Sequence, residues 1–197
     1  MRFGVCVRIQ YLSVIVPSRP RLLVLSALLV LLSPAVVLAA SCTMPHKPHG
    51  LAPASVVRVV DGDTLIVHLG EGRSARVRLI GIDSPELHPS EKLRRDAQRS
   101  GKDTAAIQAL GAKAADFTRK HLDGRKIEIE RDATALDRYG RTLAYVWVGD
   151  ELFNLLIVRE GYASLMTIPP NVKYAETLAA CHRTARESHR GLWALGE

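Results

Sequence analysis

Residues 56–80 read VVRVVDGDTLIVHLGEGRSARVRLI, and this stretch decides the fold. It contains three runs rich in β-branched and aliphatic residues, at 56–60, 65–69 and 75–80. An Asp-Gly-Asp corner separates the first two runs, and a Gly-Glu-Gly corner separates the last two. Because Asp and Gly at such corners favour tight turns between antiparallel strands, we predict a three-stranded meander.

The rest of the chain predicts two further strands and three helices. The strands are residues 126–130 and 142–148, and the helices, marked by caps and by helical spacing of apolar residues, are 104–121, 151–160 and 173–189. Residues 87–102 are polar and charged, and we predict a long loop there. Short strands joined mostly by turns favour a closed barrel over a parallel sheet, which needs helical crossovers. The predicted fold class is α+β, a five-stranded OB-fold (oligonucleotide-binding) β-barrel with three α-helices.

Residues 1–41 have the composition of an N-terminal leader. They contain four arginines and no acidic residue, and an apolar run at 22–40 leads to a small-residue end. This order is typical of a secretory signal peptide, although the run is also just long enough to span a bilayer as a retained membrane anchor. We predict export with either outcome, a linker over residues 42–53 and one globular domain over residues 54–197.

The basic character of the chain comes partly from this leader. The whole sequence has 27 Lys and Arg against 20 Asp and Glu, a net charge of +7. Without the four arginines of the leader, the net charge falls to +3. Overall charge is therefore weak support for a nucleic-acid partner, and such a function has to be inferred from local groups of residues.

Cys42 directly follows the leader, and the preceding Ala-Ala-Ser makes an imperfect lipobox. One alternative is a lipidated Cys42 that tethers the chain to a membrane, and the other is plain signal cleavage nearby. Cys42 and Cys181 could also pair in an oxidising compartment. Against pairing, Cys181 falls on the apolar face of a predicted helix, which favours a buried thiol.

Two turns at the ends of predicted strands carry carboxylates. Asp61 and Asp63 flank one glycine, and Asp83 and Glu86 flank a Ser-Pro pair. Each turn taken alone is typical of ordinary turn chemistry. If the two turns converge, their oxygens suit calcium, which binds carboxylates, backbone carbonyls and waters. Neither turn has the spacing of an EF-hand loop.

Arg78 and Arg141 supply the complementary charge. Two guanidinium groups can hold a phosphate in a fork and offset the charge of its transition state, although most arginines on strands are surface residues or ion-pair partners. Alternation along the strand places Arg78 on the same face as Arg76. Glu86 is the best candidate for a general base, because it follows the Asp83 turn and a carboxylate beside a cation stays ionised.

Other hydrolytic chemistries lack support in the sequence. The seven histidines form no HExxH motif, and His46 and His49 lie in the predicted linker, where a chance pair is the simpler interpretation. There is no GxSxG motif and no Cys and His set around Cys181. Seryl and cysteinyl hydrolysis are therefore not expected.

The motifs together resemble the staphylococcal nuclease-like, or thermonuclease, family. The resemblance runs from Val56 to Trp193 and rests on five motifs in order. These are VDGDT (60–64), RLIGIDSPE (78–86), DRYGR (137–141), LAY (143–145) and LIVREG (156–161).

This resemblance implies calcium-dependent hydrolysis of phosphodiester bonds in DNA and RNA. By position, Asp63 and Asp83 would be carboxylate ligands of Ca²⁺, and the backbone carbonyl of Ser84 would be a third ligand. Glu86 would act on the attacking water. Ser84 stands where the family often has Thr, a mild change if only its carbonyl is used.

The resemblance also implies a substrate site. Arg78 and Arg141 would bind the scissile phosphate, and Arg138 and Tyr139 would line the nucleotide site. Residues 165–170 fall where the best-known member presents tyrosines to a base, and they contain no aromatic side chain for such stacking. The 87–102 stretch is longer than usual, and its basic residues either recruit the polyanionic backbone or form a solvated run of charge. These residues are Lys92, Arg94, Arg95, Arg99 and Lys102.

The alternative function comes from a different class of protein, a non-catalytic OB-fold module that binds nucleic acid at the cell envelope. Modules of that kind usually lack part of the set of acids and arginines, and here the set is complete. A third interpretation, a structural lipoprotein domain, depends on Cys42 alone. We expect a monomer that is secreted, periplasmic or membrane-anchored.

Overall fold

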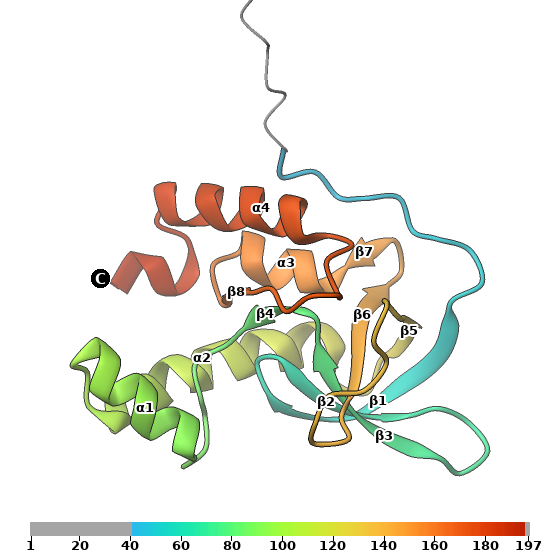
Figure 1. Ribbon diagram of the computed structural model, residues 1–197, viewed down its shortest axis with the longest axis horizontal. Helices are drawn as coiled ribbons and strands as arrows, with labels where there is room; N and C mark the ends of the chain where they lie inside the picture. Colours follow the sequence, from blue (N-terminus) through green and yellow to red (C-terminus); the bar gives the residue numbers. More distant parts are fainter. Residues whose placement is uncertain (1–40, 196–197) are drawn as a thin grey trace, which may run out of the picture. The chain divides into compact units, whose positions relative to one another are not determined.

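The computed structural model describes residues 41–195 (Figure 1). The predicted leader lies outside this range apart from Ser41, so the signal-peptide and anchor interpretations stay predictions. Within the described range, no helix combines the length and the apolar character needed to cross a membrane.

Five strands close into a barrel, as predicted. The meander consists of β1 (Ala52–Asp61), β2 (Thr64–His68) and β3 (Ser74–Leu79), and it is completed by β5 (Lys126–Glu130) and β6 (Thr142–Val148). Antiparallel pairing follows the order β3-β2-β1-β5-β6, and a parallel pairing of β3 with β6 closes the ring. The short β7 (Glu151–Leu152) extends the sheet next to β6, and β4 (Gly81–Asp83) pairs with β8 (Ser164–Met166) in a separate two-stranded sheet.

The described residues form four α-helices, one more than predicted, and a 3-10 helix. They are α1 (Glu91–Ser100), α2 (Thr104–Leu122), α3 (Phe153–Arg159), α4 (Ala175–Glu187) and the 3-10 helix η1 (Gly191–Leu195). Helices α2, α3 and α4 correspond to the three predicted ones. Helix α3 begins later than predicted because Glu151 and Leu152 pair with β6 before the chain turns into the helix.

Helix α1 lies inside residues 87–102, so the prediction of a loop there was wrong. The Ser90 Oγ atom caps the helix by accepting a hydrogen bond of 3.0 Å from the Leu93 backbone nitrogen, and Gly101 ends it in the left-handed conformation. Leu93 is the one buried residue of α1, so the helix has no apolar stripe. Since helix prediction depends mainly on such a stripe, capping was the available sequence signal.

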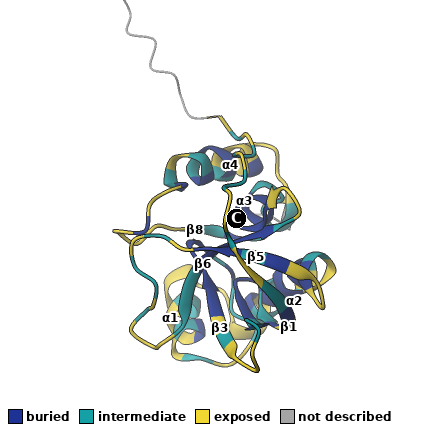
Figure 2. Ribbon diagram, turned by 90° about the vertical axis from the view of Figure 1, so that its right-hand side faces the viewer, coloured by how far each residue is buried: buried dark blue, intermediate teal, exposed yellow. Residues whose placement is uncertain are grey.

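One cluster of buried side chains joins the barrel interior to α3 and α4 (Figure 2). Leu65 and Val77 from the barrel, Phe153 from α3 and Leu178 from α4 all belong to it. Glu130, a buried carboxylate in the same region, accepts hydrogen bonds from the Trp147 indole at 2.7 Å and from the Tyr174 hydroxyl at 3.0 Å. The core therefore fixes α3 and α4 to one part of the barrel.

A disulfide joins Cys42 to Cys181 of α4. Pairing is therefore the correct alternative, and the prediction of a free buried thiol at Cys181 was wrong. The disulfide favours plain signal cleavage over the alternative of a lipidated Cys42, because a lipid thioether would need the sulfur that is bonded to Cys181. The segment before β1 is held further by an ion pair of 2.6 Å between Lys47 and Glu128.

Removing the disulfide is expected to lower the free energy of unfolding substantially. The bridge spans a sequence separation of 139 residues, and closing loops of this length stabilises a protein by about 5 kcal/mol through the unfolded state. The measurement is urea unfolding of the Cys42→Ser/Cys181→Ser double variant beside the oxidised wild type. Wild type unfolded with reductant is the matched control and should approach the double variant. Equal unfolding midpoints for oxidised wild type and double variant would contradict this expectation.

Candidate active site

The two carboxylate turns converge in the structure. Asp63 lies at the β1–β2 corner and Ser84 follows β4, and the Asp63 Oδ2 atom accepts hydrogen bonds from the Ser84 backbone nitrogen at 2.7 Å and from its hydroxyl at 3.1 Å. Within the first turn, Asp61 Oδ1 accepts a hydrogen bond of 3.2 Å from the Asp63 backbone nitrogen. The two acidic turns, which the sequence predicts as separate features, therefore form one structural unit.

Helix α2 contacts the backbone of both turns, at Gly62 in the first and at Glu86 in the second. The Thr118 hydroxyl donates to the Gly62 carbonyl at 2.9 Å. A Cβ atom at Gly62 would lie 2.7 Å from the Ser84 Cβ atom, and one at Gly111 of α2 would lie 2.5 Å from the Glu86 carbonyl oxygen. Only glycine leaves room for these contacts, so Gly62 and Gly111 set how closely the acidic turns approach.

Arg78 is the buried cation of this unit, with only 8% of its surface exposed. From β3 it reaches Asp63 Oδ2 at 3.2 Å and Asp83 Oδ1 at 2.9 Å. Its Nη1 atom also donates to the carbonyl oxygens of Leu79 at 3.0 Å and Ile82 at 2.9 Å. These bonds hold the guanidinium in one orientation among the carboxylates.

The acids of the cluster differ in pKa. Burial disfavours the Asp63 carboxylate, but the Arg78 charge and the Ser84 hydrogen bond outweigh burial and lower the Asp63 pKa. At Asp61, burial and the neighbouring Asp63 charge raise the pKa to about 7. Burial and the Asp63 charge also raise the pKa of Asp83, against the opposing effects of Lys92 and Arg78. Asp63 is therefore the most firmly ionised of these three aspartates.

Glu86 lies at the edge of the same cluster. Its Oε2 atom accepts a hydrogen bond of 3.1 Å from the Ser90 hydroxyl, and its Oε1 atom lies 3.0 Å from the Lys92 ammonium. The Gln108 side chain donates to the carbonyl of the next residue, Leu87, at 3.1 Å. Helices α1 and α2 together therefore hold the Glu86 segment.

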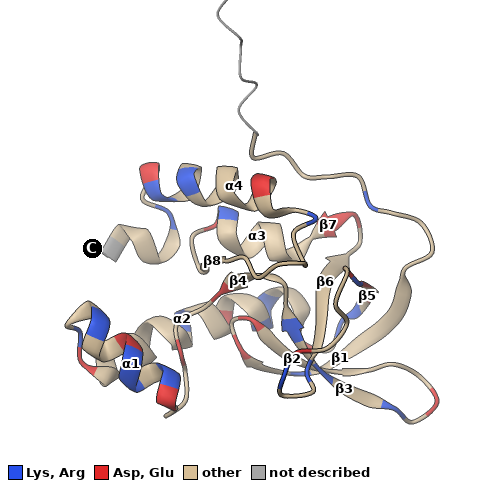
Figure 3. Cartoon of the chain, viewed as in Figure 1, with Lys and Arg blue, Asp and Glu red and all other residues tan. Residues whose placement is uncertain are grey.

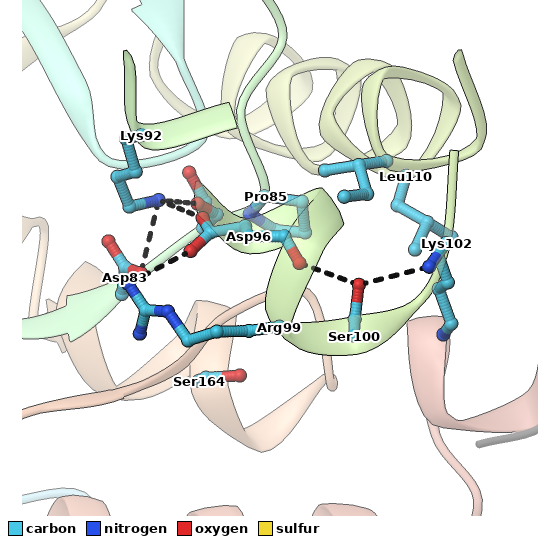
Figure 4. A pocket seen from close by; sticks show the side chains of 11 residues that line it. Asp83, Pro85, Lys92, Asp96, Arg99, Ser100, Lys102, Leu110 and Ser164 are labelled. Atoms are coloured by element: carbon cyan, nitrogen blue, oxygen red, sulfur yellow. Dashed lines mark hydrogen bonds and ion pairs between the residues drawn. The ribbon is translucent and has the colours of Figure 1, made fainter. Parts of the chain in front are cut away.

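Lys92 of α1 belongs to the cluster, whereas the sequence placed it only among the basic residues of 87–102 and not with the acids. Its ammonium lies 3.2 Å from Asp83 Oδ2, 3.0 Å from Glu86 Oε1, 3.2 Å from the Ser84 carbonyl oxygen and 3.5 Å from Asp96 Oδ2. It also lines a pocket of about 370 Å³ with Asp83, Ser84 and Asp96, among others (Figure 4). Burial would lower the Lys92 pKa, but the charges of Asp83 and Glu86 outweigh it and raise that pKa.

Arg141, Arg138 and Tyr139 form a second group in the turn before β6. The Asp137 carboxylate accepts hydrogen bonds from the Arg141 backbone nitrogen at 2.9 Å and from Arg141 Nε at 2.6 Å. The Arg138 guanidinium lies over the Tyr139 ring, 4.7 Å from its centroid, and 68% of the Tyr139 surface is exposed. Since Thr142 pairs with Val77 of β3, this turn adjoins the strand that carries Arg78. The contacts of Arg141 are with Asp137 and Tyr139, and none is with Asp63, Asp83 or Glu86.

The oxygen atoms around Lys92 fit a hard cation. Asp83 Oδ2, the Ser84 carbonyl and Glu86 Oε1 all face the one positive charge of the ammonium. Carboxylate and carbonyl oxygens are the ligands that calcium takes in proteins. Among residues 41–195, no three His, Cys, Asp or Glu side chains are grouped as a metal site. The calcium ligands expected from the resemblance are two carboxylates, Asp63 and Asp83, and the backbone carbonyl of Ser84, so they do not form such a group of three side chains.

Fold and site together define a class of protein, an OB-fold barrel that carries a buried arginine among carboxylates beside its strands. The profile of the family described as Staphylococcal nuclease homologue matches residues 76–195. This match includes Arg78, Asp83, Glu86 and Arg141, and the VDGDT motif precedes it. The chain therefore belongs to the staphylococcal nuclease family, and the resemblance inferred from the motifs is confirmed.

Individual relatives agree with this assignment. The chain is 37% identical to a thermonuclease of Staphylococcus hyicus over 155 residues, which cover 76% of this chain and 83% of that protein. It is 39% identical to a thermonuclease of Staphylococcus intermedius over 138 residues, which cover 70% and 74% of the two chains. Endonuclease YncB of Bacillus subtilis is 26% identical over 154 residues, which cover 76% of this chain and 66% of that protein.

Proposed function

We propose that this chain is a calcium-dependent nuclease that hydrolyses phosphodiester bonds of DNA and RNA. The observation that carries the proposal is the convergence of Asp63, Asp83 and Glu86 on Arg78 and Lys92. Oxygen ligands for a cation, a fixed guanidinium and a candidate base are the groups that phosphodiester hydrolysis needs in one place. The relatives named thermonuclease and endonuclease support the same reaction class.

The proposed ion ligands are Asp63, Asp83 and the Ser84 carbonyl. A calcium ion bound there would neutralise charge on the phosphate and orient the attacking water. Asp63 fits this duty because its lowered pKa keeps it ionised over a wide pH range. Asp63 accepts a hydrogen bond from the Ser84 backbone nitrogen, and this bond keeps Asp63 next to the residue that carries the proposed carbonyl ligand.

Glu86 and Arg78 are the protein side chains that would act directly on the water and on the phosphate. Glu86 would accept a proton from the attacking water as the new P–O bond forms and the ester P–O bond breaks. The Arg78 Nη1 atom is held by two backbone carbonyls, so Nη2, which faces Asp83, is the atom that would donate to the phosphate. Arg141 would add a second guanidinium, and Arg138 and Tyr139 would contact the nucleotide.

The expected result of metal removal is a loss of activity. The purified protein should degrade single-stranded DNA when calcium is added and should stop when excess chelator is present. Parallel reactions with other divalent ions establish which metal supports cleavage, and RNA in place of DNA tests the second substrate. Equal cleavage rates in calcium and in excess chelator would contradict the metal role.

Gly111→Ala is expected to reduce cleavage without unfolding the protein. In a helix this change normally adds about 1 kcal/mol of stability, but here the new Cβ atom would lie 2.5 Å from the Glu86 carbonyl oxygen. Displacing a catalytic group by about an ångström can cost a hundredfold in rate. Lys113→Ala, at an exposed position of α2, is the matched control. A wild-type cleavage rate in Gly111→Ala would show that the packing of α2 does not position Glu86.

We also propose that the protein is exported and acts as a monomer, with residues 1–41 as a cleaved signal peptide or a retained anchor. The Cys42–Cys181 disulfide supports this proposal, because disulfides persist in oxidising compartments. In this proposal residues 42–53 connect the leader to the nuclease domain of residues 54–197. Mass spectrometry of the mature N-terminus distinguishes the two forms of leader, and a reduced protein confined to the cytosol would contradict export.

A further inference from the structure

The Lys92 ammonium contacts two of the three proposed ion ligands, Asp83 and the Ser84 carbonyl, while the third, Asp63, is paired with Arg78. Three of the oxygen contacts of the ammonium, Asp83 Oδ2, the Ser84 carbonyl and Glu86 Oε1, belong to residues assigned to the ion or to the attacking water, and they lie between 3.0 and 3.2 Å from it. In Figure 4 the Lys92 side chain extends from α1 toward Asp83. The oxygens that would face an ion are therefore already facing a positive charge.

A divalent ion and this ammonium would compete for the same oxygens. A calcium ion within about 2.5 Å of Asp83 and Ser84 would come very close to an ammonium that contacts the same atoms. Two like charges only a few ångströms apart repel strongly in a partly buried site. Since 25% of the Lys92 side chain is exposed, the side chain has a route out of the cluster toward solvent.

The position of Lys92 on α1 allows its side chain to move away from the acidic cluster. Leu93 is the one buried residue of α1, and the helix carries charges of both signs, with Glu91, Arg94, Arg95 and Arg99 exposed (Figure 3). Asp96, one turn further along the same helix, lies 3.5 Å from the Lys92 ammonium and provides a partner outside the oxygen set of the site. Movement of Lys92 toward Asp96 disturbs none of the buried barrel core.

We propose that Lys92 is a tethered cation that fills the metal site in the ion-free protein and must withdraw before a divalent ion binds. The inference rests on the proposed function and deepens it, because it assigns the control of ion affinity to one residue. Withdrawal also releases Glu86 Oε1, which Lys92 now engages. Binding of the ion and release of the candidate base are therefore the same event.

The test is calorimetric titration of calcium into the full-length protein. Lys92→Met removes the competing charge, and it should bind calcium about tenfold or more tightly, because wild type binds only through the minor state in which Lys92 has left. Lys92→Arg retains the charge and should bind no more tightly than wild type. Lys120→Met is the matched control, since it makes the same change in net charge at an exposed position of α2 outside the pocket and should leave calcium affinity unchanged.

Hydrogen exchange of α1 supplies a readout that is independent of activity and of the variants. Calcium should speed amide exchange over residues 91–100 in wild type, because the helix loses the Lys92 contacts. Equal calcium affinity in wild type and Lys92→Met, with cleavage intact, would overturn the tethered-cation proposal and leave the nuclease proposal standing. Loss of calcium binding in Lys92→Met would also overturn it, because Lys92 would then be a requirement for binding. Absence of calcium binding in wild type and every variant would overturn both proposals.

Discussion

Glu86→Gln is expected to lower the cleavage rate of single-stranded DNA by about a thousandfold, because a positioned general base contributes between a hundredfold and ten-thousandfold. The amide has nearly the shape of the carboxylate but cannot accept a proton from water. Its carbonyl oxygen can still accept the hydrogen bond from Ser90, which now measures 3.1 Å. The fold and substrate binding should therefore survive while kcat falls.

The measurement is single-turnover cleavage in calcium, with DNA binding measured separately. Glu91→Gln is the matched control, because Glu91 lies in the first turn of α1 close by in sequence and pairs with Arg94 instead of with the cluster. Circular dichroism checks that both variants are folded. A rate in Glu86→Gln close to that of wild type would remove Glu86 from the mechanism.

Arg78→Ala is expected to harm both activity and stability. Arg78 is paired with Asp63 and Asp83 in a buried setting, and removing one partner of such a pair costs about 3 kcal/mol or more, since the remaining charges are uncompensated. Loss of a guanidinium that stabilises the transition state should lower the rate by at least about a hundredfold. Arg78→Lys separates the two effects, because it keeps the charge and loses the fork of donors.

Urea unfolding and cleavage rates measured on the same samples test this expectation. Arg76→Ala is the matched control, because Arg76 lies two residues earlier on β3 and is exposed. It should change neither quantity much. If Arg78→Lys cleaved as fast as wild type, a simple positive charge would suffice and the proposed role of the oriented Arg78 Nη2 donor would be wrong.

The barrel was predictable because its strands follow simple rules. Alternation, β-branched runs and Gly or Asp corners specify the meander, and the parallel closure between β3 and β6 confirms the barrel that those features predict. Alternation also placed Arg76 and Arg78 on one face, but it could not distinguish their environments. Arg78 is buried because the chain after β3 passes over it and offers the Ile82 carbonyl and Asp83, whereas Arg76 lies further from that turn.

The site was only partly predictable. The two acidic turns and Arg78 were found from charge and spacing, and the contact between Asp63 and Ser84 joins them. The place of Lys92 among the acids was not predicted, because Lys92 lies on α1, a polar helix that hydrophobic patterning does not reveal. A capping residue at Ser90 and the spacing of Lys92 and Asp96 at i,i+4 were the signals that could have found the helix.

The cysteine pairing was open from sequence for a different reason. Cys42 and Cys181 are separated by 139 residues, and nothing local in either segment indicates the other. An apolar helical face around Cys181 fits a buried thiol and a buried disulfide equally well, since both remove the sulfur from water. Long-range packing of the segment before β1 against α4 decides between them.

The most direct test of the central claim is the cleavage rate of labelled single-stranded DNA by wild-type protein as calcium is titrated into a chelated sample. The cluster of Asp63, Asp83, Glu86 and Arg78 predicts that cleavage starts only when free calcium appears and saturates as the ion site fills. DNA that is bound but stays intact at every calcium concentration would contradict the account, and it would favour a non-catalytic nucleic-acid-binding barrel.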